Sequence, residues 1–315
     1  MKFLAIAYGD DVKLGAEELK HLACSGSYKI DGQVVCLDGK KFDYSRLAYI
    51  RQLYALLFIT TRDKLDSDSR RFNWERHCRG SFRVNGLNLG LGLRYLGSLV
   101  WHRLKNPRVD LVNPDTVIGF IGAGDSVYVG KLVFNNDEHF ADRRPHLRPG
   151  FHPSSLQPKL ARALVNLAIT RKRGTVADPF CGTGGILIEA ALLGYKAVGS
   201  DCSGKMVHLC RKNIGYFKLG NAACSKADAT VARIKADAVV ADPPYGICSS
   251  LNKSDRSVLY RKFLSNAYRQ LKKGSRVVVM FPNRFRGRGR FRVVAEIDHY
   301  VHKSLTRHIM VLEKP

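Results

Sequence analysis

An alternation of short apolar segments with helix-like segments constrains the second half of this 315-residue chain most strongly. Strand candidates spaced by helices predict a parallel, doubly wound α/β sheet. The expected strands are 175–177, 197–199, a weaker one near 224, 238–241, 276–281 and 306–312, and the expected helices are 160–170, 186–193, 205–217 and 260–271.

The first half has a different pattern, which indicates an α+β region. Its strand candidates are 3–8, 34–37, 82–84 and 127–134, and its helix-like segments are 14–23 and 47–58. Residues 141–158 are rich in proline and basic side chains, which is typical of a linker or wrapping loop. We therefore expect an N-terminal region over 1–140, a linker over 141–158 and an α/β domain over 159–315.

The charge of the chain is strongly positive and unevenly distributed. The net charge is +25. Residues 151–315 contain 29 Lys and Arg against 10 Asp and Glu, whereas residues 1–150 contain 23 against 17. Such an excess favours a polyanionic partner such as nucleic acid, and the alternative is a basic surface that serves solubility.

Membrane, secretory and metal-binding features are not indicated by the sequence. No apolar run approaches the ~20 residues of a membrane helix, and the apolar start MKFLAIAYGDD is too short for a signal peptide. The eight cysteines form no CxxC pair, so neither a zinc site nor a redox pair is expected. Reduced thiols in the cytoplasm are the simplest interpretation.

The segment DPFCGTGG (178–185) follows a strand and precedes a helix. Its glycines, at 182, 184 and 185, allow a tight turn and close approach of a ligand. The spacing is neither GxGxxG nor that of a P-loop, which argues against a dinucleotide or a triphosphate. Asp178 would repel a phosphate and suits a cationic or hydroxyl-bearing ligand.

Two further aspartates follow the next strands. Asp201 can accept the hydroxyls of a ribose, and Asp228 is placed to meet an adenine amino group. Each aspartate alone could be a helix N-cap. Together with Asp178, however, they place acids at three successive strand ends, a pattern that fits S-adenosyl-L-methionine, in which adenosine is joined to a sulfonium.

The segment Asp242-Pro243-Pro244-Tyr245 follows the strongest strand candidate. An exocyclic base amine is a weak nucleophile, because its lone pair is delocalised into the ring. Asp242 and the carbonyl of Pro243 could accept its two protons and direct the lone pair at a methyl group. The prolines would fix this carbonyl and Tyr245 could stack on an extruded base, whereas the alternative is a rigid turn with an N-cap aspartate.

The segment RFRGRGRFR (284–292) interleaves arginine with phenylalanine and glycine. Arginine can grip phosphates and phenylalanine can stack on bases, so we expect RNA contact at Arg284, Arg286, Arg288 and Arg290. A solvated hairpin tip is the alternative. Cys181 in the glycine turn could suggest a nucleophile, but the Asp242 segment favours direct transfer to an amine.

The glycine turn and the Asp242 segment together resemble Rossmann-type S-adenosylmethionine-dependent amino-methyltransferases over residues 150–315. More narrowly, residues 143–168 are similar to the interdomain segment of the archaeal tRNA (guanine-N2)-methyltransferases that modify position 10. In that family an N-terminal THUMP domain binds RNA, and VDLVNPDTVIGFIGAGDSVYVGKL (109–132) resembles the end of such a domain. Residues 1–45 match no motif.

The resemblance implies methylation of guanosine N2 in tRNA, without a metal ion. It assigns the cofactor positions to Asp178, Phe180, Gly182, Thr183, Gly184, Asp201 and Asp228, the catalytic motif to Asp242, Pro243, Pro244 and Tyr245, and the methionine end of the cofactor to the neighbourhood of Ser155 and Gln157. The tRNA position, the number of methyl groups and the oligomeric state stay open. The alternatives are another guanosine of tRNA, DNA adenine-N6 methylation, and a non-enzymatic RNA-binding protein with a vestigial cofactor fold.

Overall fold

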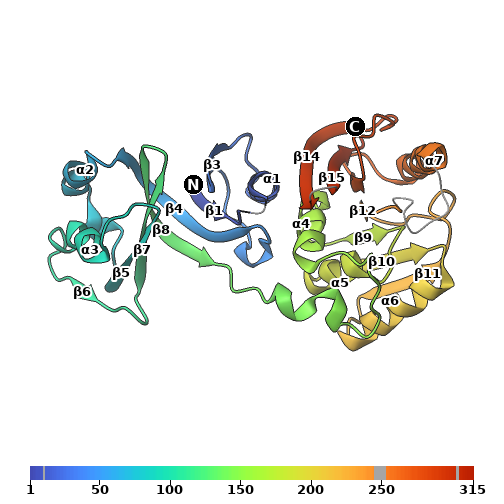
Figure 1. The fold of residues 1–315 in the computed structure, drawn as a ribbon, viewed down its shortest axis with the longest axis horizontal. Helices are drawn as coiled ribbons and strands as arrows, with labels where there is room; N and C mark the ends of the chain where they lie inside the picture. Colours follow the sequence, from blue (N-terminus) through green and yellow to red (C-terminus); the bar gives the residue numbers. More distant parts are fainter. Residues whose placement is uncertain (10, 245–252, 303–304) are drawn as a thin grey trace. The chain divides into compact units, whose positions relative to one another are not determined.

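The computed structural model describes residues 1–9, 11–244, 253–302 and 305–315. The chain forms two compact units (Figure 1). The first contains Met1–Ser45 and Tyr49–Asp137, and the second contains Arg46–Ala48 and Glu138–Pro315. Residues 138–158 thus lie within the second unit.

The first unit is built on an eight-stranded mixed sheet with the order β2-β3-β1-β4-β8-β7-β5-β6. Its strands are β1 (Lys2–Ala7), β2 (Lys29–Asp31), β3 (Val34–Asp38), β4 (Ile50–Thr61), β5 (Ser81–Leu87), β6 (Arg108–Val109), β7 (Thr116–Ala123) and β8 (Ser126–Asn135), and its helices are α1 (Val12–Leu22), α2 (Leu65–Arg71) and α3 (Leu93–Trp101). The α+β prediction for this region is correct. A core around Trp74, Phe82 and Phe120 packs α3 and the neighbouring loops onto the sheet.

The helix expected over 47–58 is wrong, because this segment contributes most of the central strand β4. Its leucines and alanine favour a helix in isolation. In the folded unit, however, Ala55 lies opposite Phe3 of β1 and Lys131 of β8. Pairing on both sides satisfies the backbone of the strand and outweighs the intrinsic helix preference.

The second unit contains a seven-stranded sheet with the order β11-β10-β9-β12-β13-β15-β14. Its strands are β9 (Thr175–Asp178), β10 (Lys196–Asp201), β11 (Ala222–Lys226), β12 (Ala238–Ala241), β13 (Arg276–Phe281), β14 (Arg292–His302) and β15 (Leu305–Glu313), and its helices are α4 (Pro158–Ala168), α5 (Gly185–Leu192), α6 (Gly204–Tyr216) and α7 (Lys253–Gln270). The first five strands in this order are parallel, which confirms the doubly wound sheet. No helix within the described parts of the chain is long and apolar enough to cross a bilayer.

The end of this sheet departs from the prediction. β15 runs antiparallel to both β13 and β14, and β14 was not expected as a strand. β14 was not predicted because a glycine- and arginine-rich segment precedes it and charged residues interrupt its apolar pattern. As a consequence, the start of β15 returns to the edge of the sheet where the parallel strands end.

Helices cover both faces of the second sheet. α7 packs Tyr260, Phe263 and Leu264 against a face that includes Val239 and Val277. α4 packs against β12 and β13 and also against α5, which lies on β9 and β10. Because the helices cover the faces of the sheet, the loops at the carboxyl ends of the parallel strands project from its edge.

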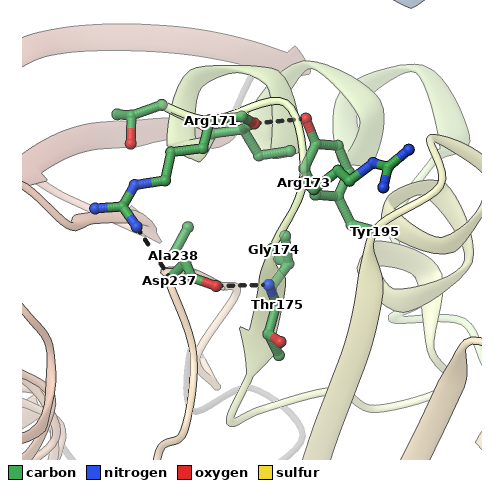
Figure 2. A pocket seen from close by; sticks show the side chains of 10 residues that line it. Arg171, Arg173, Gly174, Thr175, Tyr195, Asp237 and Ala238 are labelled. Carbon is green, nitrogen blue, oxygen red and sulfur yellow. Dashed lines mark hydrogen bonds and ion pairs between the residues drawn. The ribbon is translucent and has the colours of Figure 1, made fainter.

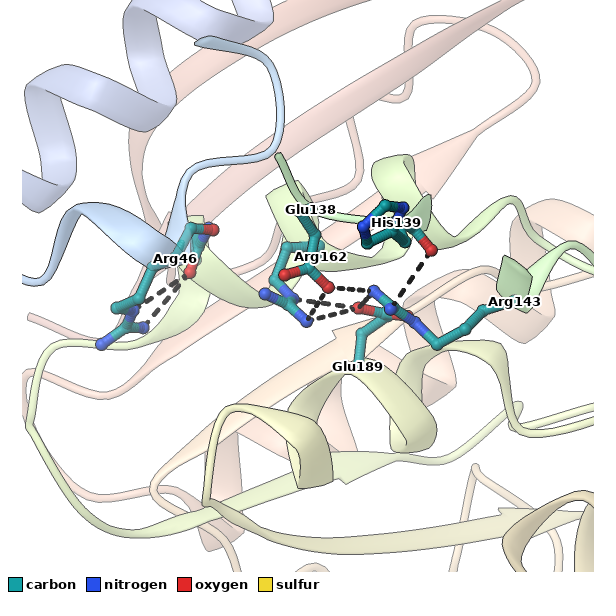
Figure 3. A network of polar contacts seen from close by, with 7 residues as sticks. Arg46, Glu138, His139, Arg143, Arg162 and Glu189 are labelled. Atoms are coloured by element: carbon teal, nitrogen blue, oxygen red, sulfur yellow. Dashed lines mark hydrogen bonds and ion pairs between the residues drawn. The ribbon is translucent and has the colours of Figure 1, made fainter. Parts of the chain in front are cut away.

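A buried ionic network fastens the segment before α4 to the second unit (Figure 3). Glu189 on α5 is fully buried and pairs with Arg143 at 2.9 Å and with Arg162 of α4 at 2.8 Å. Glu138 pairs with Arg143 from the other side at 2.7 Å. The proline-rich segment is therefore packed onto α4 and α5 through specific contacts.

Candidate active site

The carboxyl ends of the parallel strands meet at one edge of the second sheet, and the predicted site residues lie along this edge. β9 ends at Asp178 and β10 ends at Asp201, while Asp242 directly follows β12. The strand order reverses between β9 and β12, which are neighbours in the sheet. Parallel sheets bind ligands at such a reversal, so the glycine turn after β9 and the segment after β12 flank the expected site.

The glycine turn between β9 and α5 has the backbone geometry that its sequence predicts. Gly182 and Gly184 have φ angles of 50° and 88°, in the left-handed region that favours glycine. A Cβ at residue 184 would lie 2.8 Å from Sγ of Cys210, so a larger residue does not fit there. α5 starts immediately after this turn, which places the first N–H groups of the helix beside the expected ligand.

Hydrogen bonds join the turn to the end of β10. Oδ2 of Asp201 accepts from the N–H of Gly182 at 3.0 Å, and Oδ1 accepts from the N–H of Ser203 at 2.9 Å. Each oxygen keeps a second lone pair, which a ribose hydroxyl could use. Asp228 is exposed and accepts from the N–H of Thr230 at 2.8 Å. Both aspartates thus organise local backbone, and their cofactor roles stay predictions.

Two other predicted cofactor residues, Phe180 and Thr183, are held by neighbouring side chains. The ring of Phe180 packs edge-on against Phe263 of α7, with 5.1 Å between the ring centroids. The hydroxyl groups of Thr183 and Ser155 lie 2.8 Å apart. Ser155 is therefore beside the glycine turn, whereas Gln157 lies at the N-cap of α4.

Asp178 is a buried carboxylate in an acidic neighbourhood. It is 1% exposed and accepts from the N–H of Phe180 at 3.0 Å. Burial raises its pKa well above the usual range, and the negative charges of Asp242 and Asp201 raise it further. A cationic ligand at this edge would relieve the repulsion, whereas a phosphate would add to it. The edge is therefore suited to the sulfonium of S-adenosylmethionine.

The two carboxylate oxygens of Asp242 have different surroundings. Oδ2 lies 3.6 Å from Nη1 of Arg307. Oδ1 is buried and has no hydrogen-bond partner among the described residues. Burial raises the pKa of Asp242 to about 7, against the lowering effect of Arg307. A buried acceptor without a donor is unfavourable, so Oδ1 is suited to accept an N–H from a substrate.

The two prolines after Asp242 are anchored to α7. Pro243 is buried, and the carbonyl of Pro244 accepts from the hydroxyl of Tyr260 at 2.9 Å. Because proline has a restricted φ and no N–H, this anchored segment has few alternative conformations. Tyr245 lies outside the described residues, so its stacking role stays a prediction.

The four arginines between β13 and β14, at 284, 286, 288 and 290, are exposed. Arg284 also pairs with Asp298 of β14 at 2.9 Å. The phenylalanines of this segment point inward, because Phe285 packs against Phe281 and Phe291 is a member of the α7 core. Phe291 is too buried to stack on an RNA base. Stacking by the half-buried Phe285 stays a prediction, as does phosphate contact by the exposed arginines.

A hollow at the opposite edge of the sheet is formed where β9 and β12 begin (Figure 2). The carboxylate of Asp237 accepts from the N–H of Thr175 at 2.8 Å and lies 3.9 Å from Arg171. The hollow has a volume of about 10 Å³. That is close to the space needed by one water molecule and far below that of a cofactor pocket.

Sequence reasoning missed the two side chains that contact the segment after β12, Arg307 and Tyr260. Neither belongs to a motif. The one available signal for Arg307 was its place near the start of the final strand. If that strand returns antiparallel, its first residues must reach the edge where Asp242 lies.

Comparison with known proteins decides the family. Residues 145–287 match the model of the RMKL-like methyltransferase domain. A tRNA (guanine(10)-N2)-dimethyltransferase from Methanothermobacter thermautotrophicus is 35% identical over 281 residues, which cover 85% of this chain and 84% of the relative. The chain belongs to the archaeal tRNA (guanine-10-N2)-methyltransferase family. A member from Pyrococcus abyssi is 33% identical and covers 80% of this chain and 79% of its own.

More distant relatives of this tRNA (guanine-10-N2)-methyltransferase family also match most of the chain. A tRNA (guanine(6)-N2)-methyltransferase from Thermus thermophilus is 30% identical, covering 75% of this chain and 73% of the relative. The crystal structure of TrmN from Thermus thermophilus superposes with a TM-score of 0.53 over 100% of both chains at 23% identity, which shows the same fold. S-adenosylmethionine is the cofactor of the family, as the sequence predicted.

Proposed function

We propose that this enzyme transfers methyl groups from S-adenosylmethionine to the exocyclic N2 of guanosine 10 in tRNA. The observation that carries the proposal is the carboxylate of Asp242, whose buried Oδ1 has no partner among the described residues. It lies at the strand reversal, beside the glycine turn expected to hold the cofactor. Membership in the family supports the substrate.

The residues of the site act by holding the amine and by orienting its lone pair. When bound, S-adenosylmethionine would supply an electrophilic methyl group to the amine nitrogen, which would give up one proton as S-adenosylhomocysteine leaves. Oδ1 of Asp242 and the carbonyl of Pro243 would accept the two N–H groups of guanine N2. Asp242 would then accept the released proton, and Tyr260 holds the segment through its hydrogen bond to Pro244.

The cofactor would lie across the glycine turn. Asp201 would accept the ribose hydroxyls, and Asp228 would face the adenine amino group. Asp178, Phe180, Gly182, Thr183 and Gly184 would form the floor of the site, with the buried carboxylate of Asp178 favouring the sulfonium charge. The acids at the ends of β9 and β10 and directly after β12 support a cationic ligand, because their negative charges would repel a phosphate.

Position 10 is favoured because the relatives with 35% and 33% identity carry that position in their names, and both are named dimethyltransferases. We therefore propose two successive transfers, giving N2-methylguanosine and N2,N2-dimethylguanosine. Position 6 is the second candidate, since the Thermus thermophilus relative at 30% identity is named for it. DNA adenine-N6 methylation shares the motif logic but has no support from these relatives.

The proposal assigns tRNA binding to both units and places the reaction in the cytoplasm. The first unit would be the THUMP-containing module, with the stretch 109–132 running from the end of β6 through β7 into β8. In the second unit, the exposed Arg284, Arg286, Arg288 and Arg290 would contact phosphates. The net charge of +25 supports this partner.

Asp242→Ala tests the mechanism. We expect a rate loss on the order of 10²–10³, by analogy with the loss of one preorganised hydrogen-bonding partner of a transition state. Binding of S-adenosylhomocysteine, measured by calorimetry, should remain within a few-fold of wild type. Turnover near the wild-type rate would remove Asp242 from the reaction.

A further inference from the structure

The antiparallel final strand brings a cation to the proposed catalytic carboxylate. In the sheet, His308 of β15 lies opposite Phe281, the last residue of β13. The start of β15 therefore lies at the carboxyl edge of the parallel strands. Arg307 is at this point, with its Nη1 3.6 Å from Oδ2 of Asp242.

Both partners of this ion pair are largely shielded from solvent. The side chain of Arg307 is 16% exposed and that of Asp242 is 14% exposed. Screening by water is weak for such a pair, so its charges interact more strongly than those of a surface pair. The pair occupies one carboxylate oxygen and leaves the other, Oδ1, directed elsewhere.

The other ionisable groups near Asp242 are a second carboxylate at the end of β9 and a tyrosine and an arginine on α7. Asp178 at the end of β9 is a second carboxylate that feels the charge of Asp242. On α7, Tyr260 contacts Pro244 and has a pKa raised to about 12 by burial and by Asp242, while Arg256 lowers the pKa of that tyrosine. The cation that lowers the pKa of Asp242 itself is Arg307.

We propose that Arg307 is a positioning residue for methyl transfer. By pairing with Oδ2, it holds the Asp242 carboxylate ionised and turned so that Oδ1 accepts an N–H of the guanine amine. The inference rests on the proposed function and extends it to a residue outside the Asp-Pro-Pro-Tyr motif.

The physical consequence is a specific pH dependence. Without Arg307, Asp242 would remain in a buried site beside Asp178 and would lose the arginine that favours its charged form. Its pKa would then rise, since burial and a neighbouring carboxylate both favour the protonated form. A protonated carboxyl group presents an O–H to the amine and loses acceptor capacity. The rate should therefore fall at neutral pH and recover in alkaline solution.

The test is the pH profile of single-turnover methylation of tRNA by the full chain, with saturating S-adenosylmethionine. We expect the acid limb of Arg307→Gln to move to higher pH by at least about one unit, which lowers the rate at pH 6.5 on the order of tenfold, with recovery near pH 9. Arg307→Lys retains the charge and should keep the limb of the wild type. In an Asp242→Asn background, Arg307→Gln should have little further effect on the rate.

Arg276→Gln is the matched control. Arg276 pairs with Glu313 at 3.2 Å at the opposite end of the same strand pair and is similarly buried, with 15% exposure. Its loss should change thermal stability and leave the acid limb in place. Affinity for S-adenosylhomocysteine, which lacks the sulfonium charge, should be unchanged in the Arg307 variants, as measured by calorimetry.

An equal rate loss for Arg307→Gln at every pH would overturn the inference. An effect of Arg307→Gln confined to the KM for tRNA would also overturn it, because it would indicate that Arg307 contacts RNA. If Arg307→Gln does not fold, a shifted limb in Arg307→Lys would contradict the proposal. If the wild type forms no N2-methylguanosine, the proposed function fails, whereas an unshifted limb in an active enzyme removes only the role of Arg307.

Discussion

At the scale of single residues, the proposed site depends on carboxylates that are costly to bury and are kept near one another. Asp178 has its pKa raised by burial and by two neighbouring acids, and Asp242 has a pKa of about 7. A site built only for stability would avoid such repulsion, because replacing a buried charge with an apolar group is often favourable. The arrangement is understandable if a cation occupies the site during function.

This charge arrangement predicts that the cofactor binds with release of protons. A sulfonium favours the ionised carboxylates, so it lowers pKa values that are raised in the free enzyme. Affinity for S-adenosylmethionine should therefore be full above the raised pKa values and should weaken as the pH falls through about 7, the value for Asp242. The loss should approach tenfold per pH unit for each group that titrates.

S-adenosylhomocysteine is the matched control, because it lacks the positive charge and keeps the adenosine and amino acid groups. Its affinity should depend less on pH than that of S-adenosylmethionine. Calorimetric titration of both ligands between pH 5.5 and 8.5 makes the comparison. Equal pH dependence for the two ligands would show that the carboxylates do not sense the sulfonium.

At the scale of elements, the Glu189 network determines whether the segment before α4 stays attached. Glu189→Gln would remove the buried negative charge that Arg143 and Arg162 share. We expect a loss of about 3–5 kcal/mol in the free energy of unfolding, the cost typical of breaking a buried ion pair. Chemical denaturation measures it.

The exposed pair between Asp66 and Arg70 on α2 is the control for this prediction. Its side chains are 44% and 63% exposed and the atoms are 2.6 Å apart. Asp66→Asn should cost no more than about 0.5 kcal/mol, because surface pairs one helical turn apart contribute little. Similar losses for the two variants would mean that the Glu189 network contributes no more than a surface pair.

The arginine segment before β14 carries a second prediction at this scale. Replacing Arg284, Arg286, Arg288 and Arg290 with serine should reduce the slope of log tRNA affinity against log salt by about 3, since each phosphate contact contributes about 0.9 and Arg284 already pairs with Asp298. Serine at exposed positions 171–173, at the opposite edge of the sheet, should leave the slope unchanged. An equal reduction by both sets would indicate nonspecific attraction.

The pattern of apolar residues predicted those strands and helices whose intrinsic preference matches their place in the fold. β12 and β13 were predicted with their observed bounds, 238–241 and 276–281, because buried parallel strands are short apolar runs. β4 was misassigned because its leucines favour a helix locally, whereas pairing with β1 and β8 stabilises a strand in the fold. β14 was missed because strand pairing with β15 compensates for its charged residues.

In the site, the sequence predicted the residues at the strand ends but not the contacts that depend on the fold of distant segments. Strand-end residues such as Asp178, Asp201 and Asp242 could be placed together, because parallel topology brings carboxyl ends to one edge. The direction of a ring could not be deduced: Phe291 proved to be a core residue, and the half-buried Phe285 packs against that core. Arg307 reaches Asp242 through an antiparallel return that no local pattern indicates.

At the scale of the whole molecule, a basic methyltransferase unit is combined with a first unit that we propose to recognise tRNA. A guanosine within a stem must leave its base pair to reach Asp242, at a cost of a few kcal/mol. Salt-dependent contacts to phosphates cannot by themselves choose one nucleotide, because they carry no sequence information. A second contact with tRNA, made by the first unit, would provide that choice.

The most direct test is to identify the methylated nucleoside and its position. Unmodified tRNA transcript would be incubated with the full chain and S-adenosylmethionine carrying a deuterated methyl group, then digested and analysed by mass spectrometry. We predict labelled N2-methylguanosine followed by N2,N2-dimethylguanosine, both lost when guanosine 10 is replaced and retained when guanosine 6 is replaced. Label in adenosine, or label lost only on replacement of guanosine 6, would contradict the account.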